Sequence, residues 1–257
     1  MSRDCFWLTK DQFAVLKPLL PNDTRGKPRV DDRRVISGII QVLKSGGRWI
    51  DAPEVYGPRK TLYNRFVRWA AKGVWVDIFH ALATAGGPPA QVLIDSSAVK
   101  AHRCASGGKG GNISRPSADR AAGTTKIHAL TDAECRPVAF LLTGGQIADC
   151  TAGAVLLEEM PRSAILHGDK GYDSDAIRRQ VEGKGAMPNI PPKANRHWKN
   201  CFSPVLYRSR NAIERMFCRL KDFRRIATRY SSRNQFPHRR LHRCGCQLLV
   251  MSPESRP

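Results

Sequence analysis

Three observations predict a mixed α/β fold that follows a small helical region. Apolar residues recur at helical spacing through residues 1–85, the breaker sequence AGGPP occupies positions 85–89, and strand-like runs alternate with helical runs after it. We therefore expect a helical domain over residues 1–85, an α/β domain over residues 91–230, and an atypical, disordered tail over residues 231–257.

The helical region is expected to contain three helices. Thr9 can cap a first helix over residues 10–19, a second follows at about 31–44, and a third begins near Arg59. The third helix carries basic residues outside its apolar side, namely Lys60, Arg65 and Arg68. A basic helix after a helix and a loop is compatible with a helix-turn-helix that reads the major groove of DNA. A small helical bundle with a solvated basic face has the same pattern.

The second region has the element order of a nuclease core. Strands are expected over residues 92–99, 124–132, 137–145, 163–169 and 187–192, and helices over residues 151–160, 174–185 and 204–225. Three consecutive strands followed by crossover helices describe an RNase H-like mixed sheet flanked by helices.

Two aspartates occur at positions where α/β sheets bind ligands. Asp95 lies within the first strand after an apolar run, and Asp169 ends the fourth strand. Ligands and metals often bind at such strand ends. Either aspartate alone can equally be a residue that makes a turn. A third group is therefore needed before the pair indicates a catalytic site.

The last helix supplies that group. Four of its residues, Tyr207, Arg210, Glu214 and Lys221, fall within about 60° of one another at ~100° per residue. They form a polar edge beside an apolar stripe that can pack on the sheet. Glu214 would then lie beside Asp95 and Asp169. Ordinary salt bridging between Arg210 and Glu214 on a solvated face is the alternative.

Three carboxylates of this kind predict a divalent metal site. Asp95, Asp169 and Glu214 are hard oxygen ligands and can hold two Mg²⁺ ions, for which Mn²⁺ can substitute. Such a pair of ions catalyses phosphoryl transfer by activating the attacking oxygen and stabilising the leaving 3′ oxygen. The nearby cations Lys126, Arg210 and Lys221 are suited to contact DNA phosphates.

The charge of the chain favours a polyanionic partner. Lys and Arg number 43 against 22 Asp and Glu, which gives a formal charge of +21. Nucleic acid is the usual partner of such a protein, although a ribosome-associated or membrane-surface protein can be equally basic. No apolar run approaches the ~20 residues of a membrane span, and the first residues lack a signal-peptide pattern. We therefore expect a cytoplasmic, nucleoid-associated protein with no membrane partner.

Several segments together resemble one known family. They are GKPRVDDRRVISGIIQVLKSGGRWIDAPEVYGP, TLYNRFVRWAAKGVW, IDSSAVKAHR, TTKIHALTD, GDKGYDSD, IPPKANR and YRSRNAIERMFCRLKDFRRIATRY. Over about residues 6–230 the chain is similar to the bacterial insertion-sequence transposases of family five, DDE enzymes with an RNase H-like core. The last segment contains the family arrangement Y-x2-R-x3-E-x6-K at Tyr207, Arg210, Glu214 and Lys221.

The resemblance implies a function in DNA transposition. It implies that Asp95, Asp169 and Glu214 are the catalytic carboxylates, and that the enzyme nicks the 3′ ends of the element and joins them to target DNA. The expected partners are double-stranded DNA, as terminal inverted repeats and as target, and further copies of the chain. Two alternatives stay open, a defective remnant that binds element ends without cutting, and an unrelated RNase H-like nuclease.

The sequence after Tyr230 departs from the family, which continues there into an apolar helix. A single-base frameshift in the gene near Tyr230–Ser231 would explain the change, and the DNA sequence tests this hypothesis. A zinc site is a second interpretation, with His238, His242, Cys244 and Cys246 as ligands at cramped spacing. A disordered basic arm that contacts DNA is the third.

A few further residues have weaker signals. The stretch 106–123 reads either as a DNA-contacting loop or as a plain mobile loop. Trp198 is expected to pack in the fold rather than to stack on a base. His102 and His128 are expected to be ordinary strand or loop histidines, and His167 is a candidate for the periphery of the active site.

Overall fold

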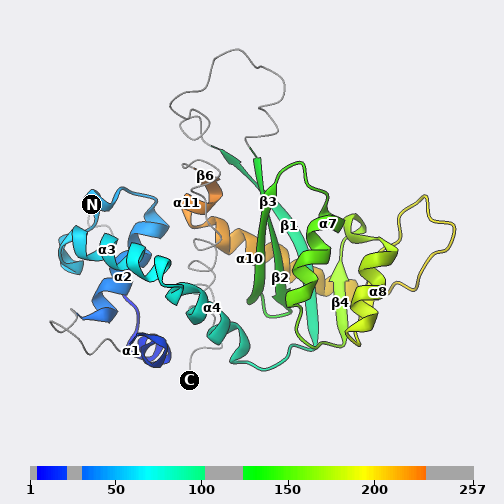
Figure 1. Cartoon of the computed structure of the whole chain (residues 1–257), viewed down its shortest axis with the longest axis horizontal. Coiled ribbons are helices and arrows are strands. Elements are labelled where there is room, and N and C mark those ends of the chain that lie inside the picture. Colours follow the sequence, from blue (N-terminus) through cyan, green and yellow to red (C-terminus); the bar gives the residue numbers. More distant parts are fainter. Residues whose placement is uncertain (1–4, 22–30, 102–123, 230–257) are drawn as a thin grey trace, which may run out of the picture.

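A mixed six-stranded sheet forms the centre of the protein. The computed structural model describes residues 5–21, 31–101 and 124–229 (Figure 1). Its strands are β1 (Gln91–Ala101), β2 (Thr124–Asp132), β3 (Pro137–Gly144), β4 (Ile165–Gly168), β5 (Met187–Asn189) and β6 (Thr228–Arg229). The strand order is β3-β2-β1-β4-β5, and β6 pairs with β1.

The pairing directions give the sheet an RNase H-like topology, as the sequence predicts. The strands β1, β2 and β3 pair antiparallel in sequence order. The next strand, β4, returns to the other side of β1 and pairs with it in parallel, and β5 adds in parallel to β4. These two parallel strands are reached through α7 (Asp149–Leu156) and α8 (Asp175–Gly183), because a parallel pair needs a crossover connection.

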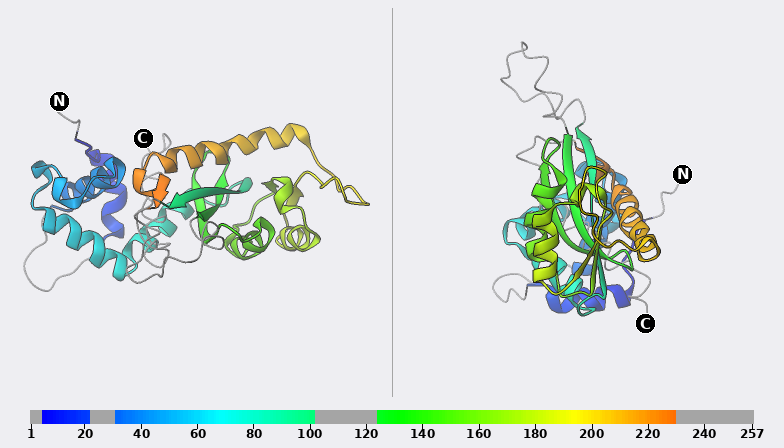
Figure 2. Two further views of the ribbon diagram at one scale, coloured as in Figure 1. Left: turned by 90° about the horizontal axis from the view of Figure 1, so that it is seen from above. Right: turned by 90° about the vertical axis from the view of Figure 1, so that its right-hand side faces the viewer.

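Alternation along β1 separates two apolar layers. Val92 and Ile94 belong to the cluster that includes Leu156 of α7 and Val181 of α8. Leu93 belongs to the other cluster, which contains the apolar residues of α10 (Asn211–Lys221). Since side chains alternate between the faces of a strand, α7 and α8 cover one face of the sheet and α10 covers the opposite one (Figure 2).

The N-terminal helices pack against the α10 side of the sheet. They are α1 (Lys10–Leu16), α2 (Asp32–Ser45), α3 (Arg59–Ala71) and α4 (Val74–Thr84). Thr9 caps α1 in a capping box, as its sequence predicts. A left-handed glycine, Gly73 at φ 78°, separates α3 from α4. The buried residues of these helices form one continuous cluster with those of α10 and of β1 and β2.

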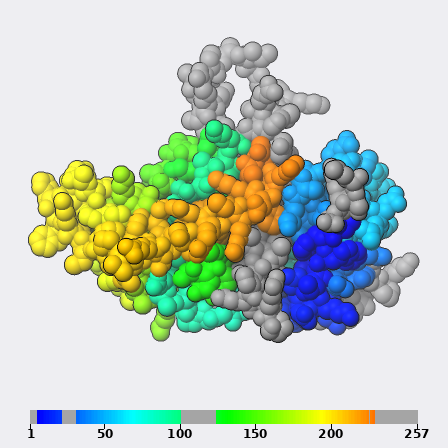
Figure 3. Space-filling view, turned by 180° about the vertical axis from the view of Figure 1, so that it is seen from behind, coloured from blue at the N-terminus to red at the C-terminus, as the bar shows by residue number. Residues whose placement is uncertain are grey.

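The polar helix predicted over residues 204–225 is divided. It comprises α9 (Pro204–Tyr207), a 3-10 turn at Arg208–Arg210, α10, and a short α11 (Arg224–Ala227) that contacts α2. Figure 3 shows this run crossing the back of the molecule, from the loop that follows β5 to the N-terminal helices. The apolar stripe of α10 packs on the sheet as predicted, with Ile213, Phe217 and Leu220 buried.

Several predictions concern residues that the structure does not describe. The loop 106–123, His102 and the three interpretations of the tail after Tyr230 all lie outside the described residues. Within the described part of the chain, no helix combines the length and the apolar character that crossing a membrane requires.

Candidate active site

The register of the sheet brings Asp95 and Asp169 together. Ile94 of β1 and Gly168 of β4 are partners in the parallel pair, so the two aspartates are the next residues on neighbouring strands. The carboxyl ends of parallel strands meet at one edge of a sheet, where α/β proteins bind their ligands. Two carboxylates that are 74 residues apart in sequence, at positions 95 and 169, thus share one edge.

Glu214 approaches this edge from α10 through a shared arginine. The Arg210 guanidinium donates to Asp95 Oδ2 at 2.7 Å and to Glu214 Oε1 at 3.1 Å. The Asp95 side chain is 15% exposed and that of Glu214 is 60% exposed, so the strand carboxylate is enclosed and the helix carboxylate faces solvent. Arg210 therefore links two of the three predicted carboxylates.

Asp169 is held by the turn that follows it. Its Oδ1 accepts a hydrogen bond from the Gly171 backbone N–H at 2.8 Å, and Asp169 is the N-cap of the 3-10 turn Lys170–Tyr172. A Cβ atom at position 171 would come within 2.8 Å of that same carboxylate oxygen. Glycine is therefore required here to let the backbone approach the carboxylate closely.

The electrostatics of the site favour binding of a cation. Burial raises the pKa of Asp95, the Arg210 charge and the Ser96 backbone bond lower it, and the negative charges of Asp169 and Glu214 raise it again, with a net increase. The charges of Asp169 and Glu214 thus both act on Asp95. Like charges gathered at one site are stabilised by any positive charge between them, which Arg210 supplies in this arrangement.

Tyr172 lies at the centre of the same region. It is buried, and its hydroxyl has no hydrogen-bond partner that meets geometric criteria. Burial, followed by the negative charges of Asp149, Asp95 and Asp169, raises the pKa of the phenol, which therefore stays protonated. Asp149, at the start of α7, is a fourth carboxylate near Tyr172, and no motif in the sequence indicates it.

The residues fit a divalent metal ion by their chemistry. Three carboxylates with oxygen donors are the ligand type that hard divalent cations select. Among the described residues, however, no three His, Cys, Asp or Glu side chains are gathered closely enough to hold a metal ion. The Arg210 guanidinium bonds to both Asp95 and Glu214.

Lys126 lies on the side of the sheet that α7 covers. It pairs with Ala98 in register, and its Nζ contacts Asp149 Oδ1 at 3.2 Å on the α7 side. Asp149 also accepts a hydrogen bond from Ser96 Oγ at 2.8 Å. Lys126 thus stabilises the start of α7 against β1, while a DNA contact by Lys126 stays a prediction.

The other polar residues of the last helix differ in their surroundings. Tyr207 packs edge to face on Phe202, with ring centroids 5.1 Å apart, and the Arg210 guanidinium lies 5.8 Å from the centre of its ring. Burial raises the pKa of the Tyr207 hydroxyl. Lys221, at the end of α10, is half-buried. Their contacts with DNA stay predictions.

The basic residues of α3 divide into two kinds. Lys60 and Arg68 are exposed. Arg65 instead makes an ion pair with Asp32 of α2 and lies over the ring of Trp69, at 5.0 Å from its centre. The Arg65 side chain is 13% exposed, and its ion pair with Asp32 connects α3 to α2. Lys60 and Arg68 are therefore better placed than Arg65 for the predicted DNA contact.

Two of the weaker predictions need correction. His167 is fully buried, and its ring nitrogens bond to Gln91 and Asn189, so it ties β4 to its neighbours rather than lining the site. Trp198 was expected to pack in the fold, but it is 78% exposed in the loop before α9. No element of the described fold covers this loop, and local sequence cannot indicate that.

His128 is an ordinary strand histidine, as predicted, and it makes stability sensitive to acid. Burial lowers its pKa to about 4, with the nearby Asp149 opposing and Lys126 adding to the effect. The unfolded chain binds a proton at this residue below about pH 6.5, whereas the folded chain does not until about pH 4. Stability is therefore lost as pH falls through this window, by up to about 3 kcal/mol.

We expect His128→Phe to remove much of that loss. Urea unfolding at pH 7 and pH 4.5 measures it, because the difference between variant and wild type isolates this residue from other titrating groups. His197→Gln, at an exposed position, is the matched control. An equal acid-induced loss in His128→Phe and wild type would contradict the assignment.

Two family models match the sequence. Residues 8–79 match the putative transposase of the IS4/5 family, and residues 86–249 match the transposase DDE domain. The second match spans more than half of the chain and contains Asp95, Asp169 and Glu214.

Two putative transposases of insertion elements agree with these matches. A putative transposase of insertion element IS6501 from Brucella ovis is 33% identical over 41% of this chain and 82% of its own length. That of IS402 from Burkholderia cepacia is 30% identical over 51% of this chain, and the match covers 64% of that relative. A piggyBac transposase synaptic complex with hairpin DNA aligns with a TM-score of 0.46 and 10% identity, over 97% of this chain and 72% of that one.

The family membership has two direct consequences. A transposase cleaves DNA and transfers its strands, so DNA is the substrate of the chemistry. A DDE domain uses divalent metal ions, which agrees with the oxygen donors at this sheet edge. The chain belongs to the transposase DDE domain family, and it is a DDE transposase of the insertion-sequence type.

Proposed function

We propose that Asp95, Asp169 and Glu214 are the catalytic carboxylates of this transposase. One observation carries the proposal: Asp95 and Asp169 directly follow Ile94 and Gly168, which are partners in the sheet, and Arg210 bonds to both Asp95 and Glu214. The charges of Asp169 and Glu214 both raise the pKa of Asp95, which supports the proposal. Mg²⁺ is the proposed cofactor, and Mn²⁺ can replace it, because both accept carboxylate oxygens.

The two proposed reactions are nicking at the 3′ ends of the element and joining of those ends to target DNA. Each is a phosphoryl transfer at a DNA phosphodiester. Bound divalent ions supply activation of the attacking oxygen and stabilisation of the leaving 3′ oxygen. In the first reaction a water oxygen attacks and the P–O3′ bond breaks, which frees a 3′-OH at the end of the element. In the second reaction that 3′-OH attacks a target phosphodiester, and a new P–O3′ bond replaces the old one. The carboxylates orient these groups, and Arg210 is proposed to leave them and contact a DNA phosphate.

We propose that the helical region 1–85 recognises the terminal inverted repeats and that residues 91–230 carry the chemistry. The exposed cations Lys60 and Arg68 on α3 support the first part. Joining two element ends requires at least two active sites, so the chain is proposed to act as a homo-oligomer on DNA. Because its substrate is chromosomal DNA, the protein is proposed to work in the bacterial cytoplasm at the nucleoid.

An in vitro strand-transfer assay tests the proposed function. The DNA is a duplex that ends in the terminal repeat of the encoding insertion sequence, with a supercoiled plasmid as target and Mg²⁺ or Mn²⁺ as cofactor. We expect joined products with either metal and none in EDTA. Ca²⁺ alone is the control for electrostatic effects of a divalent ion. Joined products in EDTA would contradict the metal-dependent mechanism.

The same assay distinguishes the alternative, a remnant that binds ends without cutting. That reading requires specific binding of the terminal repeat together with no product under any metal. A protein with the proposed reading frame restored after Tyr230 is the matched comparison. Activity confined to the restored protein would identify the tail as the cause of a defect.

Removal of Arg210 is expected to make stability depend on metal. In Arg210→Ala, Asp95 loses its partner, and the free energy of unfolding without divalent ions falls by about 1–3 kcal/mol. An added ion no longer competes with the guanidinium, so Mn²⁺ stabilises the variant more than the wild type. Urea unfolding with and without Mn²⁺ measures both effects. Arg219→Gln, exposed on the same helix, is the control, and equal stabilisation by Mn²⁺ in Arg210→Ala and wild type would refute the expectation.

A further inference from the structure

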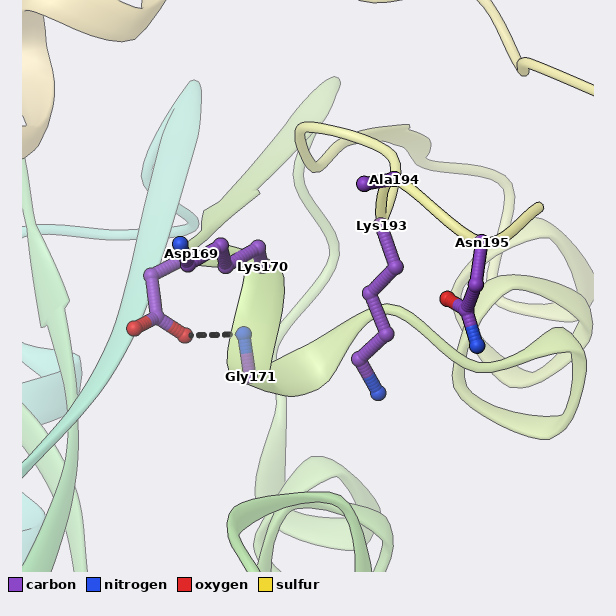
Figure 4. Close-up of a pocket in the computed structure, with 6 residues that line it drawn as sticks. All are labelled: Asp169, Lys170, Gly171, Lys193, Ala194 and Asn195. Carbon is purple, nitrogen blue, oxygen red and sulfur yellow. Dashed lines mark hydrogen bonds between the residues drawn. The ribbon is translucent and has the colours of Figure 1, made fainter.

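A basic pocket opens beside Asp169. It has a volume of about 520 Å³ and is lined by Asp169, Lys170, Gly171, Lys193, Ala194 and Asn195 (Figure 4). One wall is the turn after β4, and the other is the loop that follows β5. In the view of Figure 4, Lys193 and Asn195 extend from that loop in the same direction. The pocket therefore combines one candidate catalytic carboxylate with the Lys193 ammonium and the Asn195 amide, while the Lys170 side chain points away from Lys193 (Figure 4).

The loop that carries Lys193 has no regular secondary structure but is firmly anchored. The Lys193 backbone N–H donates to Asp173 Oδ2 at 2.8 Å, and Arg196 Nε donates to the same oxygen at 2.6 Å. Arg178 binds the other oxygen at 2.9 Å, and it also donates to the Ile190 carbonyl at 2.8 Å. The Asp173 side chain is fully buried. Burial raises the pKa of this carboxyl, but the bonds from Arg196, Lys193 and Arg178 outweigh burial, so the pKa lies below its usual value.

The anchoring leaves the charges of the pocket available. The side chains of Lys170, Lys193 and Asn195 make no hydrogen bond or ion pair with any described residue of the protein. The Lys193 ammonium forms no ion pair with a described carboxylate, so it is available to an anion that enters the pocket. A lysine is suited to a phosphate oxygen, because its ammonium is a compact point charge with three donors.

The location of the pocket indicates which phosphate it takes. The loop after β5 lies at the opposite end of the molecule from the N-terminal helices (Figures 1 and 3). Under the proposed function those helices bind the interior of the terminal repeat and Asp169 acts at its end. DNA that reaches the pocket has then passed the cleavage position.

We propose that this pocket is a subsite for a backbone phosphate of the DNA strand that continues past the cleavage position, with Lys193 as its main cation. The inference rests on the proposed function of Asp169. Lys193 is a positioning residue, since it holds the flanking strand while the carboxylates act on the neighbouring phosphate. Phosphate contacts fix the register of a protein on DNA without reading its sequence. The subsite therefore accepts any flanking sequence.

Salt-dependent binding in EDTA tests the subsite without catalysis. Two duplexes carry the same terminal repeat, of which one continues past the cleavage position and the other ends there. Fluorescence anisotropy at about 50–200 mM salt gives the affinity and its slope against salt. For Lys193→Gln we expect roughly tenfold weaker binding of the continuing duplex and a salt slope smaller by about one, with no change for the ending duplex.

Matched variants keep the result specific. Lys199→Gln removes the same charge from an exposed position of the same loop outside the pocket, and it should behave as wild type on both duplexes. Lys193→Arg should restore most of the affinity and slope. The thermal midpoint of Lys193→Gln should not change, since the anchoring bond comes from the backbone.

Two outcomes would overturn the subsite. One is an unchanged slope of Lys193→Gln on the continuing duplex, and the other is an equal loss on both duplexes, which would indicate a contact elsewhere along the DNA. In either case wild type still prefers the terminal repeat over unrelated DNA. Absence of that preference in wild type would instead contradict the proposed function.

Discussion

Replacing Asp169 by asparagine should reduce strand transfer by about a thousandfold or more. The change removes one negative charge and one strong metal ligand while keeping the shape of the side chain. Metal ions contribute several kcal/mol of transition-state stabilisation, and a loss of ~4 kcal/mol corresponds to about a thousandfold in rate. Single-turnover assays of both 3′-end nicking and joining measure this loss. Both steps should fall together, because they share the carboxylates.

The fold should survive this substitution. The asparagine Oδ1 can still accept the Gly171 N–H bond that defines the turn, so the thermal midpoint and the affinity for the terminal repeat should stay close to wild type. Glu182→Gln, an exposed carboxylate on α8, is the control for charge and should retain full activity. Strand transfer by Asp169→Asn within tenfold of wild type would exclude Asp169 from catalysis.

Replacing Asp173 by asparagine should be the most destabilising of these changes. Asp173 is the partner of Arg178, whose side chain is 4% exposed, and of Arg196. An asparagine amide cannot neutralise either guanidinium, and a buried ion without its partner costs about 3–5 kcal/mol. Urea unfolding measures the free energy of unfolding. The loop after β5 should also lose its anchor, so proteolysis within residues 190–203 should become faster.

A neighbouring aspartate provides the control for this prediction. Asp175 also bonds to Arg196, but its side chain is 71% exposed. An exposed ion pair contributes little, so Asp175→Asn should lower stability by less than about 1 kcal/mol. Similar losses in the two variants would mean that burial of Asp173 is not what makes its bonds important.

The sequence by itself determined the order of the elements and the layers of the sheet. Residues 92–94 are all apolar, as in a strand that is buried on both faces, and the apolar residues of α10 recur at helical spacing. The same reasoning predicted Asp95 within a strand, Asp169 at a strand end and Glu214 on the polar edge of a helix. These patterns are local, and they are therefore visible without knowing what each element packs against.

The tertiary structure decided how the charged residues are used. The pairing of β2 with β1 turns Lys126 toward Asp149, and its predicted DNA contact stays a prediction. Arg65 bonds to Asp32 of another helix, and Arg210 is shared between Asp95 and Glu214. Apart from Glu214, which is four residues from Arg210 on the same helix, these partners are far away in sequence. Local periodicity carries no information about the distant partners.

The pocket beside Asp169 illustrates the same division. The sequence shows a basic segment after the fifth strand, yet nothing in it indicates that Asp173, 20 residues before Lys193, holds that segment in place. A buried carboxylate can satisfy donors from several segments only after the chain has folded around it. The types of the residues were thus fixed by the sequence, whereas their pairing, and with it the free charge of Lys193, came from the fold.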